Sequence, residues 1–97
     1  MADIDPRHTK IDKLIPTVIG TIVLENHARF PSAESNLYCV GDYGRMVWTA
    51  EKPEASALYT KVKLNDDGET LSAYTAAGHA CELNLRTGKL ISQAVIK

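Results

Sequence analysis

The chain has 97 residues, 44% of them hydrophobic and 24% charged, with a net charge of −1. This length limits it to one domain, and the charge balance excludes the basic surface that binds nucleic acids or anionic membranes. No stretch approaches the roughly 20 apolar residues of a membrane span, and the N-terminus is too acidic for a signal peptide. We therefore expect a cytoplasmic protein with no nucleic-acid and no membrane partner.

Residues 1–16 show no clean hydrophobic period. Ile11, Leu14 and Ile15 could form one helical turn, but Pro16 would end it. We expect an irregular N-terminal arm over 1–16, docked by these three side chains.

From Thr17 onward the apolar period changes to two, which is typical of strands. Glycine-containing turns separate most of the strands, and a longer loop over 25–35 follows the first of them. The sequence predicts an antiparallel all-β chain with no helix. The seven predicted strands are 18–24, 36–40, 45–50, 58–64, 69–75, 79–85 and 89–96.

A polar segment with a proline, residues 51–56, divides these strands into two groups. We expect a single all-β domain over 17–97, built of two similar units over about 17–50 and 57–97. The second unit has four strands and three tight turns, and the first has three strands.

The two units share an imperfect repeat. In each, an apolar strand runs into a glycine followed at once by a cation, Gly44-Arg45 and Gly88-Lys89, and a second apolar strand then begins. The two glycines are 44 positions apart, about the length of a four-stranded propeller blade. One such blade cannot bury its faces alone, so the repeat indicates how this chain finds its core.

The segment from Asp42 to Trp48, DYGRMVW, resembles the end of the repeat in pyrroloquinoline-quinone-type β-propellers. In that family an Asp, a Gly-Lys/Arg step and a Trp recur in each blade, and the Trp packs between adjacent blades. The segment 83–91, LNLRTGKLI, looks like the same stretch, but Ser92 stands where the second Trp would be. The resemblance implies blade-like sheets, and it implies no quinone site because nothing matches the family's cofactor ligands.

A closed propeller needs about four blades or more, and this chain has two. Two or three chains could close a propeller by symmetric association, as two-blade subunits of small bacterial and fungal lectins do. Alternatively, the strands could form one small β-sandwich or barrel, or the chain could pair with a companion protein. These alternatives stay open at this point.

Asp42, Tyr43, Arg45 and Trp48 form the most informative group of polar and aromatic residues. A carboxylate, a cation and two aromatic rings beside a turn are what a polar-ligand or partner site uses. We therefore name these four residues, with His27 in the long loop, as the candidate binding site. The competing interpretation is that Asp42 stabilises its own turn and Trp48 fills a gap between sheets.

The remaining candidates for chemistry favour structural roles. Glu25 and His27 could form an acid/base pair, but a surface histidine is the simpler interpretation. Residues 65–69, NDDGE, offer oxygen ligands to calcium but lack the spacing of an EF-hand loop, so they read as a hairpin turn. Cys39 and Cys81 lie at apolar strand positions and fit buried, reduced thiols, with a disulfide between them as the alternative. We expect no catalytic residue, no metal and no cofactor.

The last predicted strand, 89–96, is apolar on both faces. A strand of this kind lies either at the centre of a sheet or against another chain, because an exposed apolar edge promotes association. We therefore expect a non-enzymatic interaction or structural module that self-associates as a homo-oligomer or binds a companion protein. The alternative is a protein that binds a small ligand or carbohydrate at the Asp42–Trp48 turn.

Overall fold

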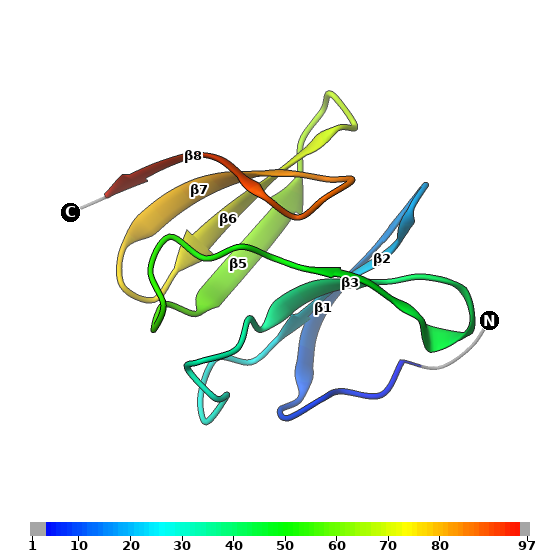
Figure 1. The fold of residues 1–97 in the computed structure, drawn as a ribbon, viewed down its shortest axis with the longest axis horizontal. Helices are drawn as coiled ribbons and strands as arrows, with labels where there is room; N and C mark the ends of the chain where they lie inside the picture. The colour runs from blue at the N-terminus through cyan, green and yellow to red at the C-terminus, as the bar shows by residue number, and fades with distance from the viewer. Residues whose placement is uncertain (1–3, 96–97) are drawn as a thin grey trace.

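The computed structural model describes residues 4–95, which form two four-stranded antiparallel sheets (Figure 1). The strand order in each sheet follows the chain, β1-β2-β3-β4 in the first sheet and β5-β6-β7-β8 in the second. This confirms the all-β prediction of two sheets. The strands of the first sheet are β1 (Ile11–Thr17), β2 (Gly20–Glu25), β3 (Leu37–Val40) and β4 (Met46–Thr49), and those of the second are β5 (Tyr59–Leu64), β6 (Thr70–Thr75), β7 (His79–Asn84) and β8 (Leu90–Val95).

The structure differs from the sequence prediction at the N-terminus. Residues 11–16, expected in an irregular arm, belong to strand β1, which ends at Thr17, so residues 4–95 form eight strands rather than seven. Pro16 is tolerated because β1 is an edge strand, where a missing N–H breaks no inner ladder. A register shift between Ile11 and Lys13 interrupts the alternation, which explains why no clean period is visible there. The other predicted strands agree with the structure to within about two residues, and Ile96, the predicted end of the last strand, lies outside the described residues.

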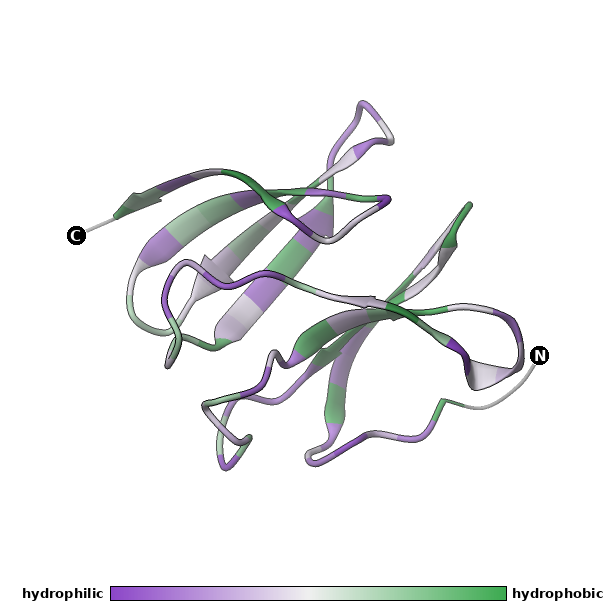
Figure 2. Ribbon diagram, viewed as in Figure 1, coloured by the Kyte–Doolittle hydropathy of each residue, from purple (hydrophilic) through white to green (hydrophobic). Residues whose placement is uncertain are grey.

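The two sheets pack face to face on one apolar core. Along β5 of the second sheet, hydrophobic residues alternate with hydrophilic ones (Figure 2), as expected for a strand with one face in the core and the other in water. The fully buried core side chains come from β2, β3, β5, β6 and β7. They include Ile22, Leu37, Cys39, Tyr59, Leu71, Ala73 and Leu83.

The opposite face of the first sheet is covered by the chain before β1. Val23, Tyr38 and Val40 form a second, smaller apolar cluster there, and Ile4 packs against it. Residues 4–10 therefore act as a strap across this face, even though they form no strand of their own.

Asn36 joins the two sheets by polar contacts. Its side-chain amide donates to the carbonyl oxygens of Glu25 and Tyr59, both at 2.7 Å, and its Oδ1 accepts the Tyr59 backbone N–H at 2.8 Å. Since Asn36 is completely buried, these bonds satisfy backbone groups that would otherwise be buried without partners. No helix within residues 4–95 is both long and apolar enough to cross a membrane.

Candidate functional site

The structure does not bring the five predicted site residues together. Asp42 and Tyr43 lie in a 3-10 turn (Asp42–Gly44) between β3 and β4, where both are exposed, as is Arg45. Trp48 lies in β4 (Met46–Thr49). Its side chain is only 8% exposed and points into the core between the sheets. The turn residues and the indole ring therefore face different environments.

His27 lies at the other end of the first sheet. It is exposed in the loop after β2, which leads into the start of β3, whereas the Asp42–Gly44 turn follows the end of β3. The two segments are thus separated by the length of that strand, so His27 does not complete a site with Asp42.

Trp48 instead ties the two sheets together. Its indole N–H donates to the backbone carbonyl of Leu85 at 2.9 Å, in the turn that follows β7. Its ring lies against Gly88 in the same turn, where a Cβ atom would be 2.4 Å from the Trp48 Cε3 atom. Gly88 also has a φ of +72°, so glycine is required there both for its backbone conformation and for the close approach of the ring.

Glu25 is completely buried and holds the strap in place. Its carboxylate accepts the backbone N–H groups of Arg7 (2.6 Å), His8 (3.0 Å) and Thr9 (2.9 Å), and it accepts the Tyr38 hydroxyl. Burial raises the pKa of Glu25, but the hydrogen bonds to its charged form outweigh burial, so the pKa lies below the usual range of a glutamate. The carboxylate is saturated by donors from its own chain, which makes it a structural group rather than half of an acid/base pair with His27.

Sequence reasoning did not anticipate this cluster. The only signal was an acidic residue, Glu25, at the end of an apolar strand, and the donors that satisfy it are backbone groups of residues 7–9, which no side-chain pattern reveals.

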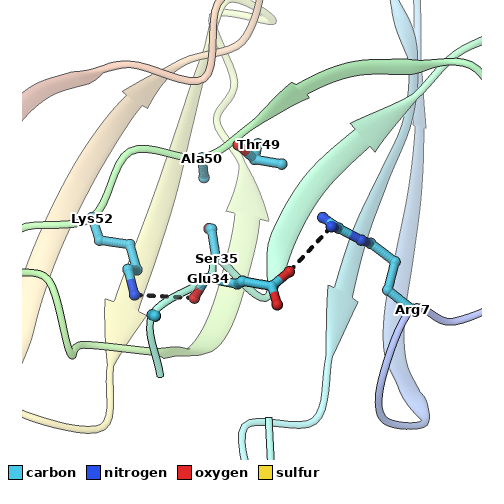
Figure 3. Close-up of a pocket in the computed structure, with 7 residues that line it drawn as sticks. Arg7, Glu34, Ser35, Thr49, Ala50 and Lys52 are labelled. Carbon is cyan, nitrogen blue, oxygen red and sulfur yellow. Dashed lines mark hydrogen bonds and ion pairs between the residues drawn. The ribbon is translucent and has the colours of Figure 1, made fainter. Parts of the chain in front are cut away.

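An open polar hollow of about 400 Å³ lies beside the strap (Figure 3). The guanidinium of Arg7 bonds Glu34 at 3.1 Å and lies 5.8 Å from the centroid of the Tyr38 ring. The ammonium of Lys52 donates to the carbonyl oxygens of Ser32 and Glu34, at 2.5 and 3.0 Å, and burial lowers its pKa. Both cations are thus engaged by the chain itself. The hollow is lined by Arg7, Ala33, Glu34, Ser35, Thr49, Ala50 and Lys52.

A second open hollow, of about 420 Å³, lies between the β1–β2 turn and the β5–β6 turn, and it is mostly apolar. It is lined by Pro16, Thr17, Val18, Leu64, Gly68 and Leu85.

Cys39 and Cys81 are both free and buried, one in each sheet. Burial raises the pKa of Cys39 to about 11 and raises that of Cys81 as well, so both thiols stay protonated at neutral pH. This is the opposite of what a nucleophile requires. Within residues 4–95, no three His, Cys, Asp or Glu side chains gather closely enough to hold a metal ion.

The most exposed regular element is β8, at one edge of the second sheet (Figure 1). Five of its six residues are exposed. Among them are the apolar side chains Ile91 and Val95, which are 52% and 65% exposed. An exposed edge strand with apolar side chains is able to pair with a further strand.

No protein-family model matches the chain, and neither a curated protein nor a solved structure matches it.

Proposed function

We propose that this chain is a non-enzymatic interaction or structural module that self-associates. The observation that carries the proposal is β8, an edge strand that leaves Ile91 and Val95 in water. Such an edge offers both apolar side chains and backbone hydrogen-bonding groups to a further strand. The protein would act by binding a surface of complementary shape, without catalysing a reaction.

The Trp48 contact supports a blade-like architecture. Two four-stranded meanders packed face to face, with a tryptophan of the first resting on a glycine turn of the second, are what the propeller resemblance implies. In this proposal Trp48 holds the two sheets of one chain together.

The free face of the second sheet favours association by edges over stacking of sheets into a closed ring. Lys61 and Lys63 of β5 and Glu82 of β7 alternate with core residues and so lie on this face. Stacking another sheet here would remove these charges from water, which is costly unless each one finds a partner. An edge contact leaves them solvated.

The alternative, a ligand or carbohydrate site at the Asp42–Trp48 turn, has less support. Stacking on a sugar or another planar ligand requires an accessible ring, and the Trp48 ring is buried against Gly88. Tyr43 is accessible, but it is the only accessible aromatic side chain in the segment from Asp42 to Trp48. A cytoplasmic location stays part of the proposal, since the free thiols of Cys39 and Cys81 suit a reducing compartment.

The test is the assembly state. Sedimentation velocity from micromolar to millimolar concentration should show a species of at least twice the 10.6 kDa chain mass, growing with concentration. A folded protein that stays at 10.6 kDa across the whole range would overturn the proposal.

A further inference from the structure

We propose that Glu25 is an acid-sensitive latch for the strap, residues 4–10. Protonation of its carboxylate frees the strap from the first sheet while the two sheets stay packed on each other. The latch does not depend on the proposed self-association, because the contacts that hold the strap all lie within one chain.

One carboxylate carries most of the polar contacts of the strap. Glu25 accepts three consecutive backbone N–H groups, those of residues 7, 8 and 9, at 2.6, 3.0 and 2.9 Å, and also the Tyr38 hydroxyl. Consecutive N–H groups that converge on one anion hold a charged carboxylate much better than a neutral one. A protonated carboxyl becomes a donor at one oxygen, so it cannot accept all of these donors. Protonation therefore weakens the whole set at once.

The charged neighbours of Glu25 set the direction of the pH effect. Burial raises the pKa of Glu25, but its hydrogen bonds lower that pKa by more, so the closed strap favours the charged form. The stabilisation is complete above the pKa that Glu25 has when the strap is open. It is lost as the pH falls through the pKa of the closed form.

A second carboxylate, Glu34, holds the side chains of the strap. Arg7 and His8 bond to it at 3.1 and 3.2 Å, and the Arg7 guanidinium also lies 5.8 Å from the centroid of the Tyr38 ring. Burial, together with the nearby Glu25, raises the pKa of the Tyr38 hydroxyl, so this group remains a donor. Both anchors of the strap are thus carboxylates, and acid weakens both. The other titratable side chains of the strap and the adjoining segments are Asp5, Lys10, Asp12 and His27, all exposed.

Apart from these bonds, the strap has few contacts. Only Ile4 and Thr9 are partly buried: Ile4 packs against the smaller apolar cluster, and the Thr9 hydroxyl donates to the Asn26 carbonyl at 2.6 Å. The strap forms no strand, and none of its residues belongs to the core between the sheets. A segment with so few buried contacts opens at a lower free energy than the sheets. Its opening uncovers the smaller cluster and leaves the main core intact.

An acid titration of the wild-type protein, followed by nitrogen–proton correlation NMR, tests the latch. The backbone N–H signals of Arg7, His8 and Thr9 report the strap, and the indole N–H signal of Trp48, bonded to Leu85, reports the packing of the sheets. The strap signals should move to the positions of an unstructured peptide at a higher pH than the indole signal is lost. Loss of all four signals at one pH would overturn the latch.

Glu25→Gln tests the same step without acid, because it replaces the carboxylate by a neutral group of the same shape. At neutral pH the strap signals should lie at their released positions, with amide hydrogen exchange at least about tenfold faster, while the Trp48 indole signal stays native. Tyr38→Phe, a milder change, should speed exchange of the strap amides by about tenfold. Glu82→Gln, the same substitution on β7 of the other sheet, is the matched control and should change neither probe.

Two results with Glu25→Gln would overturn the proposal. Strap signals that match those of the wild-type protein would show that the three N–H bonds do not depend on the charge of residue 25. A protein that also loses the native indole signal would show that the strap and the sheets unfold as one unit. The proposed self-association would stand in either case, since its test is the assembly state.

Discussion

Substitution of Gly88 by alanine tests whether the Trp48 contact holds the two sheets together. The new Cβ would lie 2.4 Å from Cε3 and 2.5 Å from Cδ2 of the Trp48 ring, well inside van der Waals contact. The ring would have to move, and its N–H bond to Leu85 would be strained or lost. Gly88→Ala therefore disturbs one defined contact between the sheets.

The magnitude follows from three contributions. Placing an L-residue at a φ of +72° costs about 1–2 kcal/mol. Overpacking against the Trp48 ring adds about 1–3 kcal/mol, and loss of the indole hydrogen bond adds about 1 kcal/mol. The expected total of about 3–6 kcal/mol is a large share of the roughly 5–15 kcal/mol that stabilises a typical domain.

Gly68→Ala is the matched control. Gly68 has a φ of +69°, and a Cβ there would meet nothing within 4 Å, so this variant measures the backbone cost alone. Thermal and urea unfolding followed by far-UV circular dichroism should show Gly88→Ala melting roughly 10–30 °C below Gly68→Ala. In a Trp48→Ala background, the two glycine substitutions should cost about the same. If Gly88→Ala and Gly68→Ala lower the free energy of unfolding equally in the wild-type background, the contact between Trp48 and Gly88 does not hold the sheets together and the reasoning is refuted.

Three further predictions concern the buried polar groups. Asn36→Ala should lower the free energy of unfolding by about 2–4 kcal/mol, because it leaves backbone groups of Glu25 and Tyr59 without partners; a loss below about 0.5 kcal/mol in urea titration would contradict this. Tyr38→Phe should cost about 1.5–3 kcal/mol at neutral pH, because it removes a hydrogen bond to the charged Glu25, and a near-neutral effect would count against that bond. Since the pKa of Glu25 is lower folded than unfolded, its contribution is complete above about pH 4.3 and is lost as the pH falls through the folded pKa. Acid unfolding should accordingly move to higher pH in Tyr38→Phe and become shallower in Glu25→Gln, and unchanged acid curves in both variants would be inconsistent with this linkage.

The strands of the second sheet were predicted almost to the residue because local pattern decides them. β5 alternates apolar and charged side chains, and the 65–69 turn has residues that tolerate a positive φ. β1 was missed for the opposite reason. Its alternation is interrupted near Asp12, and it is a strand because β2 supplies a partner.

The candidate site shows what the local sequence pattern cannot predict, namely which side chains of one segment are buried. The segment from Asp42 to Trp48 is continuous in sequence, yet its turn is in water and its indole is in the core. Strand alternation predicts that Trp48 faces one side of its sheet, but not which side meets the other sheet. The Glu25 cluster was beyond sequence reasoning, because its donors are backbone N–H groups of residues 7–9.

The sequence by itself determined the all-β class, the division into two meanders and most of the strand boundaries, since these depend on periodicity and turn residues that are local properties of the chain. Only the tertiary structure decided what Trp48, Glu25 and β8 do. Trp48 packs against Gly88, Glu25 anchors the strap, and β8 forms an exposed edge of the second sheet. The physical reason is that burial and hydrogen-bond satisfaction depend on what the rest of the chain places opposite a residue, and this is settled only when the two sheets meet.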